Sequence, residues 1–259
     1  MTEAAVIREL PEPTVLQWPA PGGEVRVLSF ASKADAGAYV AGIIAGALQG
    51  AVAERGKALW IGCGGSTPKP IYESLTTLDL DWDRITLAQV DERFVPTDDT
   101  NSNTRMMREA LEPVLDDMDF MTLIQDLSSA QACADKAEAR FLELGGGEAP
   151  VFDIALMGMG PDAHYASIFP HHVINGEVYG TDRIVLPVAP TDGSLEPVLP
   201  RITLSVPALN RSRRIIFFIT GATKLEVLRS ASQSTDPAES PIGAFLAQCP
   251  VPVEFVWAA

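Results

Sequence analysis

Segments typical of β-strands alternate with segments typical of helices along most of this chain of 259 residues. The apolar runs that predict strands lie at 25–30, 58–61, 85–90, 152–157, 183–188, 215–220 and 253–257. A repeated strand-then-helix order predicts an α/β fold, because each helix carries the chain back to begin a parallel strand. We therefore expect a doubly wound, mostly parallel sheet flanked by helices, a Rossmann-like architecture of three layers.

Three serines mark where longer helices are expected to begin. Ser32 precedes a helical pattern that reaches Arg55, Ser102 precedes a second, and Ser129 precedes a third that the glycines at 145–147 end. A serine at such a position accepts a hydrogen bond from a backbone N–H of the first turn, which otherwise lacks a partner. These signals place helices between the predicted strands.

The N-terminal segment differs from the rest of the chain. Residues 1–23 are rich in proline and show no clear period, so we expect an irregular arm there. Residues 24–259 contain no internal repeat and no low-complexity tract, and they are expected to form a single α/β domain.

One segment raises the question of a membrane. Residues 36–53 carry no charge and contain Gly42, Gly46 and Gly50 at the spacing G-x-x-x-G, which also occurs in membrane-spanning helices. The bulky residues of the segment recur at intervals of four and form one apolar stripe. We favour a helix that packs against a sheet or another helix, with the glycines allowing close contact.

The net charge of −15 narrows the classes of partner. Such a surface repels nucleic acid and anionic membranes, so neither is expected as a partner. The three cysteines form no C-x-x-C pair, and the first residues lack the features of a secretory signal. We expect a cytoplasmic protein that is a monomer or a small homo-oligomer. An anionic ligand would require a local group of cations.

Four distinctive motifs each follow a predicted strand or close it. They are G-C-G-G-S-T-P at 62–68, D-E-R-F-V-P at 91–96, G-M-G-P-D-A-H at 158–164 and T-G-A-T-K at 220–224. In an open parallel sheet, ligands bind beyond the carboxyl ends of the strands. The motifs are therefore expected to meet in one site.

The first motif predicts a phosphate cradle. Gly64 and Gly65 allow the backbone to approach an anion closely, and Ser66 and Thr67 add hydroxyl donors. The motif is not the Walker pattern, because no lysine follows the second glycine. A plain tight turn is the alternative interpretation.

Three cations accompany these motifs. Arg93 has a guanidinium that can bind an oxyanion through two hydrogen bonds. Lys224 lies in the first turn of a predicted helix, where a cation is disfavoured unless an anion is nearby. Arg201 stands directly before Ile202-Thr203-Leu204, near the same edge. For each of them, a solvated surface position is the alternative.

The third motif places Asp162 two residues before His164. An imidazole assisted by a carboxylate, at the end of a buried strand, is suited to act as a general base near neutral pH. The other histidines, His171 and His172, are adjacent and share no metal-ligand spacing with His164. We expect neither a metal nor another cofactor, and no covalent nucleophile.

In this order, the motifs resemble those of the 6-phosphogluconolactonase family, which belongs to the glucosamine/galactosamine-6-phosphate isomerase superfamily. The matching pieces are G-G-S-T-P-K-P at 64–70, D-E-R-F-V-P and S-N-T-R-M within 91–106, G-M-G-P-D-A-H-Y-A-S-I-F-P at 158–170, R-I-T-L-S-V-P-A-L-N at 201–210, and T-G-A-T-K at 220–224. The resemblance implies an enzyme of the oxidative pentose phosphate pathway that hydrolyses 6-phospho-D-glucono-1,5-lactone to 6-phosphogluconate without a metal.

The resemblance also implies roles for individual residues. His164 would activate water, with Asp162 beside it, and Arg93 would line the substrate pocket. The phosphate would be held by the turn Gly64-Gly65-Ser66-Thr67 together with Arg201 and Lys224.

Several residues depart from the family's usual D-G-H-T-A-S-L-F-P-G. Ala163 and His171 replace glycines, and Tyr165 replaces a threonine. If the first glycine requires a positive φ, Ala163 adds strain on the order of 1 kcal/mol. Tyr165 is expected to place bulk beside the proposed base, and Cys63 stands where a serine is common.

Two other functions follow as alternatives. One is an amino-sugar-phosphate deaminase or isomerase, although the R-F-V-P after Asp91 and Glu92 differs from the D-E-x-x-G-L-P pattern of that class. The other is a non-catalytic sugar-phosphate sensor, which Ala163 and Tyr165 keep open.

Overall fold

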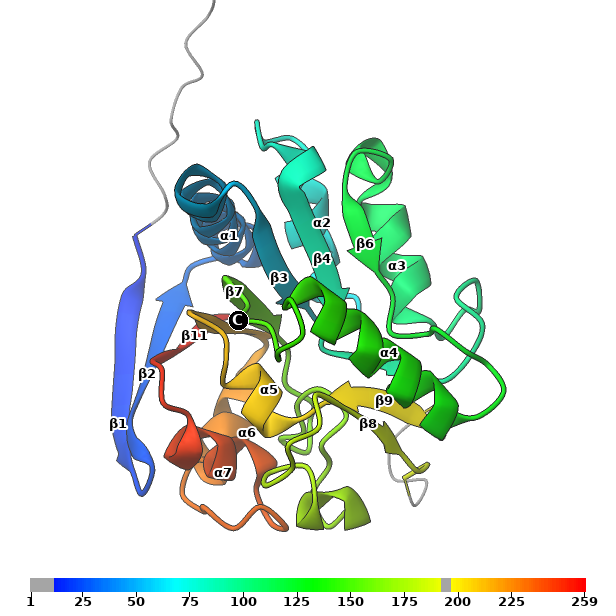
Figure 1. The fold of residues 1–259 in the computed structure, drawn as a ribbon. Coiled ribbons are helices and arrows are strands. Elements are labelled where there is room, and N and C mark those ends of the chain that lie inside the picture. The colour runs from blue at the N-terminus through cyan, green and yellow to red at the C-terminus, as the bar shows by residue number, and fades with distance from the viewer. Residues whose placement is uncertain (1–11, 192–196) are drawn as a thin grey trace, which may run out of the picture.

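The computed structural model describes residues 12–191 and 197–259. Its centre is a sheet of eight strands in the order β1-β2-β11-β10-β7-β3-β4-β6 (Figure 1). Neighbouring strands are parallel throughout except for the antiparallel pair of β1 and β2. The prediction of a doubly wound, mostly parallel sheet flanked by helices is therefore confirmed.

The strands of this sheet are β1 (Thr14–Ala20), β2 (Gly23–Phe30), β3 (Ala58–Gly62), β4 (Ile85–Gln89), β6 (Asp119–Met121), β7 (Ile154–Met157), β10 (Ile215–Thr220) and β11 (Val253–Ala258). The helices are α1 (Lys33–Arg55), α2 (Lys69–Leu75), α3 (Asn103–Ala110), α4 (Ala130–Leu144), α5 (Val206–Leu209), α6 (Ala222–Ala231) and α7 (Pro241–Gln248). Short 3₁₀ helices lie at Trp82–Arg84, Glu112–Val114 and Val173–Gly176.

A second, smaller sheet is antiparallel. It has the order β5-β9-β8 and consists of β5 (Asp91–Arg93), β9 (Arg201–Leu204) and β8 (Val185–Val188). Helix α4 packs over β8 and β9. This sheet was not predicted, and it brings two segments of the candidate site together.

The direction of winding reverses at the centre of the large sheet. From β3 the chain adds β4 and then β6 on one side, and from β7 it adds β10 and then β11 on the other. Helices α1, α2 and α3 lie behind the sheet, and α4 and α5 lie in front of it (Figure 1). Because β3 and β7 are neighbours, a crevice is expected beyond their carboxyl ends, where open α/β sheets bind ligands.

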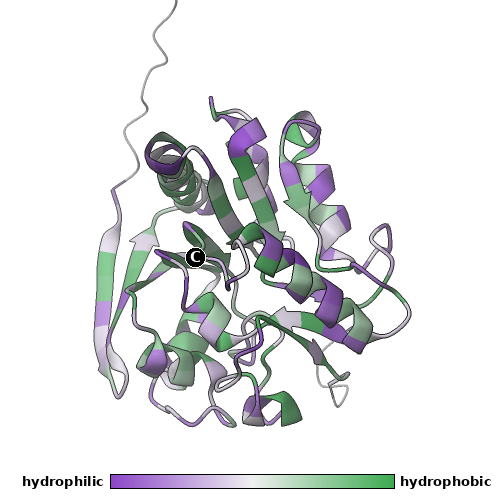
Figure 2. Cartoon of the chain, viewed as in Figure 1, coloured by the Kyte–Doolittle hydropathy of each residue, from purple (hydrophilic) through white to green (hydrophobic). Residues whose placement is uncertain are grey.

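The core lies on both faces of this sheet. All residues of β7 are buried, and so are those of β10 except Thr220. Figure 2 shows hydrophobic residues along the central strands and hydrophilic ones on the outward sides of the helices. Strands covered on both faces are expected to be almost continuously apolar, which is the pattern of these two segments.

The predicted helix starts at the three serines are confirmed. The hydroxyl oxygens of Ser32, Ser102 and Ser129 accept hydrogen bonds from backbone N–H groups in the first turns of α1, α3 and α4.

The prediction of an irregular arm over 1–23 is wrong for residues 14–20. These form β1, which pairs with β2, and the Trp18 indole Nε1 donates to Ser232 Oγ at 2.9 Å. Proline is tolerated here because an edge strand leaves one row of backbone positions without a partner strand. Residues 1–11 lie outside the described residues.

Helix α1 is long and apolar enough to cross a membrane by length and composition. In this structure, Val40, Ile44 and Leu48 are buried, and the helix contacts α2, β2, β3 and β11. This is the packed apolar stripe that the sequence favours. The expected close contact at Gly46 and Gly50 is wrong, since both face open space among the described residues.

Candidate active site

The four motifs meet in one cavity of about 260 Å³ beyond the carboxyl ends of β3 and β7. This is the crevice at which the winding of the sheet reverses. The predicted site residues that line it are Gly64, Gly65, Ser66, Thr67, Arg93, His164, Arg201 and Lys224. Asp162 does not line the cavity, but it is hydrogen-bonded to His164, which does.

His164 and Asp162 form a hydrogen-bonded pair. His164 Nδ1 lies 2.5 Å from Asp162 Oδ1, and the backbone N–H of His164 donates to the same oxygen at 3.2 Å. An ionised carboxylate only accepts hydrogen bonds, so Nδ1 carries the proton and Nε2 is left to accept one. The pair therefore has the arrangement of a base with its orienting group.

The electrostatics of this pair favour an ionised Asp162. Burial raises the pKa of the Asp162 carboxyl, but the hydrogen bonds and charge of His164 outweigh burial and hold that pKa below its usual value. A carboxylate that stays charged can stabilise the imidazolium that forms when His164 takes a proton.

Packing fixes the imidazole ring. Its centroid lies 4.5 Å from that of Phe169, and a Cβ on Gly160 would meet ring atoms of His164 at 2.1 Å. Gly160 is therefore required to be a glycine because the ring occupies that space. Ala163, between the two polar residues, has a φ of 69°, so the strain expected from the sequence is present.

The glycine loop after β3 is held from two sides. Tyr72 Oη donates to the carbonyl of Cys63 at 2.7 Å, and Gly65 has a φ of 100°. A Cβ on Gly64 would meet Asn103 Oδ1 at 1.9 Å. Gly64 thus makes room for Asn103, a role that the motif alone did not indicate.

Arg93 and Arg201 are neighbours across the pairing of β5 with β9. The Nε atoms of both guanidinium groups are buried and have no hydrogen-bond partner among the described residues. Burial lowers the pKa of Arg201, as does the charge of Arg93, while Asp91 opposes this change. Two adjacent guanidinium groups with unused donors form a strong site for an anion.

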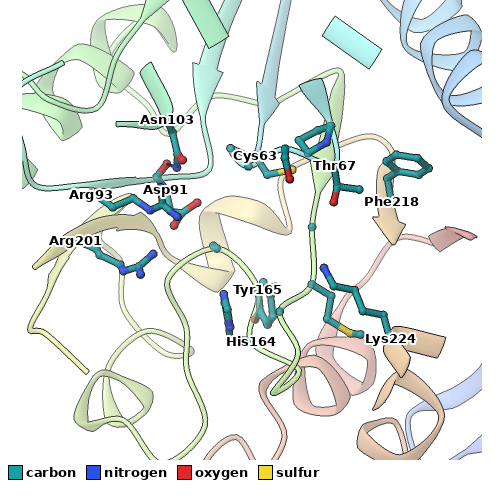
Figure 3. A pocket seen from close by; sticks show the side chains of 18 residues that line it. Cys63, Thr67, Asp91, Arg93, Asn103, His164, Tyr165, Arg201, Phe218 and Lys224 are labelled. Carbon is teal, nitrogen blue, oxygen red and sulfur yellow. Dashed lines mark hydrogen bonds between the residues drawn. The ribbon is translucent and has the colours of Figure 1, made fainter. Parts of the chain in front are cut away.

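Lys224 lies on the opposite side of His164 from the two arginines (Figure 3). It occupies the first turn of α6, as predicted, and burial lowers the pKa of its ammonium group. A half-buried cation at the N-terminal end of a helix is unfavourable without an anion, because the helix dipole is positive there. The position therefore favours an anionic ligand.

Sequence reasoning missed part of the cavity wall. The motif at 91–96 was expected to be a loop after a strand, whereas Asp91 to Arg93 form β5, and the Asp91 side chain accepts a hydrogen bond from Ser167 Oγ at 2.6 Å. Met159 and Phe218 also line the cavity. Met159 belongs to the motif at 158–164 and Phe218 to the strand predicted at 215–220, but their place in one cavity wall depends on the pairing of β7 with β10.

Of the departures from the family pattern, Cys63 and Tyr165 line the cavity, whereas Ala163 and His171 do not. Tyr165 is fully buried, and its ring centroid lies 4.9 Å from that of Phe245 and 6.0 Å from that of Phe217. Its ring therefore packs against core phenylalanines, and the residue also lines the cavity together with His164. The expectation of bulk beside the base stays a prediction. His171 has a φ of 57° and an exposed side chain.

Within residues 12–191 and 197–259, no group of three or more histidine, cysteine, aspartate or glutamate side chains is placed to hold a metal ion. The absence of a metal or cofactor from the reaction stays a prediction.

The sheet and its crevice define an α/β enzyme whose site lies at a reversal of strand order. The family model described as glucosamine-6-phosphate isomerases/6-phosphogluconolactonase matches residues 31–257, and the chain belongs to this family. A curated 6-phosphogluconolactonase of Caulobacter vibrioides is 37% identical over 90% of this chain and 97% of its own length. One of Rhizobium meliloti is 37% identical over 82% and 89% of the two chains.

Solved structures agree with these relatives. The crystal structure of a 6-phosphogluconolactonase from Shewanella baltica has a TM-score of 0.82 and 34% identity, with 90% of this chain and 97% of the other covered.

Proposed function

We propose that this protein hydrolyses 6-phospho-D-glucono-1,5-lactone to 6-phosphogluconate. The observation that carries the proposal is the His164–Asp162 pair in a cavity that also contains Arg93, Arg201 and Lys224. The relatives above bear the lactonase name, which favours this activity over that of a deaminase or isomerase.

In the proposed mechanism, His164 Nε2 takes a proton from a water molecule as the oxygen of that water attacks the lactone carbonyl carbon. The bond between this carbon and the ring oxygen then breaks, and the imidazolium returns the proton to the departing oxygen. Asp162 holds the ring and its charge stabilises the imidazolium. A positioned base typically contributes a factor of about 10²–10⁴.

The cations and the glycine loop orient the substrate. The turn from Gly64 to Thr67 would bind the phosphate together with Arg201 and Lys224, while Arg93 lines the pocket. A phosphate held away from the reacting carbon fixes the geometry of attack. The partner is thus a phosphorylated sugar lactone. That the protein is cytoplasmic, is a monomer or small homo-oligomer, and binds neither nucleic acid nor membrane stays a prediction.

The test is the rate of lactone loss with purified protein and a metal chelator, at slightly acid pH where spontaneous opening is slow. Rapid turnover by the wild type, lost in His164→Gln, is expected. Saturable binding of 6-phosphogluconate without any acceleration of lactone loss would instead identify the sensor.

A further inference from the structure

We propose that Glu92 is a positioning residue that sets Arg93 and Asn103 against the glycine loop through the first turn of α3. Glu92 is fully buried and does not line the cavity. Its carboxylate accepts hydrogen bonds from Gln89 Nε2 at 2.9 Å, the backbone N–H groups of Arg93 at 2.7 Å, Asn103 at 2.8 Å and Thr104 at 2.6 Å, and the hydroxyls of Ser102 at 3.1 Å and Thr104 at 2.9 Å.

These donors are all neutral groups. A buried carboxylate is costly unless hydrogen bonds compensate for lost water, and here several donors converge on its two oxygens. An apolar residue at this position could pack β5 against α3 without needing such hydrogen bonds. The hydrogen bonds of a carboxylate, in contrast, fix one geometry between the two elements.

Glu92 and Ser102 together complete the N-terminus of α3. Ser102 Oγ accepts from the N–H of Arg105, and Glu92 accepts from those of Asn103 and Thr104. The unpaired N–H groups of this helix end are thereby satisfied by a residue of another element. The negative charge also lies at the end of the helix that favours it. Glu92 thus fixes the start of α3 on β5.

The start of α3 in turn shapes the cavity wall. Asn103 Nδ2 donates to the carbonyl of Asp91 at 3.0 Å, and its Oδ1 fills the space beside Gly64. Arg93 Nη1 donates to the carbonyl of Asn101 at 2.7 Å, in the turn before the helix. A shift of α3 would therefore move a guanidinium of the cation wall and a contact of the glycine loop at the same time.

The test is Glu92→Gln, with inorganic phosphate as the binding probe and lactone turnover as the kinetic readout. The amide group replaces an acceptor oxygen with a donor that faces other donors. We expect phosphate to bind at least tenfold more weakly and KM to rise by a similar factor, with the pH profile of kcat unchanged because the His164–Asp162 pair lies on another loop.

Two further variants make the result decisive. Ser129→Ala removes the hydrogen bond that caps α4 far from the cavity, so it should lower the thermal midpoint and leave phosphate affinity and KM unchanged. Thr104→Val removes one donor to Glu92 with little change in shape, and it should weaken phosphate binding in the same direction if Glu92→Gln does not fold.

Wild-type phosphate affinity and KM in folded Glu92→Gln, or in Thr104→Val if the former does not fold, would overturn the proposal. The kinetic readout rests on the proposed lactonase function, whereas the phosphate readout does not. A wild type that binds phosphate without opening the lactone would refute the lactonase function and leave Glu92 to be judged by binding. A wild type that opens the lactone without binding inorganic phosphate would leave the lactonase function standing and Glu92 to be judged by KM.

Discussion

Asp162→Asn tests whether the carboxylate acts through His164 alone. The 2.5 Å hydrogen bond between Asp162 Oδ1 and His164 Nδ1 is assisted by charge. Hydrogen bonds to charged groups contribute about 1.5–3 kcal/mol, and each 1.36 kcal/mol of barrier changes a rate tenfold. We therefore expect kcat to fall about 10- to 150-fold in Asp162→Asn. Removing the base in His164→Gln should cost about 10²–10⁴-fold.

The double variant separates two mechanisms. If Asp162 only orients and stabilises His164, then Asp162→Asn should have no further effect once His164→Gln is present. The assay is the initial rate of lactone loss, corrected for spontaneous opening, in the wild type, the two single variants and the double variant. Asp116→Asn, which alters an exposed carboxylate, serves as the matched control and should equal the wild type. A full second loss in the double variant would refute the reasoning and give Asp162 an independent role in the reaction.

Three further predictions concern charge, strain and reactivity. Because burial lowers the pKa of Lys224, its charge is lost at a lower pH than in an exposed lysine. Phosphate affinity measured by calorimetry should therefore fall as pH rises through that lowered pKa, and Lys224→Met should remove this pH dependence. The same pH dependence in Lys224→Met would contradict the assignment of Lys224 to phosphate binding. His171→Gly should stabilise the protein by up to about 1.6 kcal/mol in urea unfolding. A left-handed residue costs about 1–2 kcal/mol, and glycine loses about 0.4–1 kcal/mol of this gain through the larger entropy of the unfolded chain. Ala163→Gly should gain less stability, because a buried methyl group worth about 0.8 kcal/mol is lost. A His171→Gly variant less stable than the wild type would contradict the assigned strain. Burial, with a contribution from Asp91, raises the pKa of the Cys63 thiol to about 12. Iodoacetamide should therefore modify Cys63 far more slowly than half-buried Cys249. Equal rates of modification by mass spectrometry would contradict the burial of Cys63.

Much of the fold could be predicted from the order of the apolar segments, the helix-capping serines and the motifs at strand ends. The serine caps of α1, α3 and α4 act within one helical turn, so the chain segment itself contains both partners of each hydrogen bond. The motifs at 62–68 and 158–164 could be placed in one site because the ends of parallel strands meet at one edge. The strand order, with β3 beside β7, then brought these two loops together.

The remaining parts depend on pairing between distant segments. β5 is only three residues long and is charged throughout, so nothing in its composition indicates a strand. It exists because β9 pairs with it, and that pairing sets Arg201 beside Arg93. β1 was missed because the prolines in and around it suggest a loop, although an edge strand tolerates Pro19. The hydrogen bonds of Glu92 could not be predicted, since most of its donors come from β4 and from the start of α3.

The substitutions at Ala163 and His171 bear on the choice between an enzyme and a sensor. Both residues keep a left-handed conformation without being glycine, so the surrounding contacts must determine the path of the loop. Such contacts are present: the N–H of Gly160 donates to the carbonyl of His164 at 2.8 Å, and the N–H of His171 donates to that of Ala238 at 2.6 Å. These two residues therefore lower the stability of the loop, which still holds the imidazole against Asp162 at the cavity. Because that geometry is the part a sensor could lose without penalty, its retention favours the hydrolase.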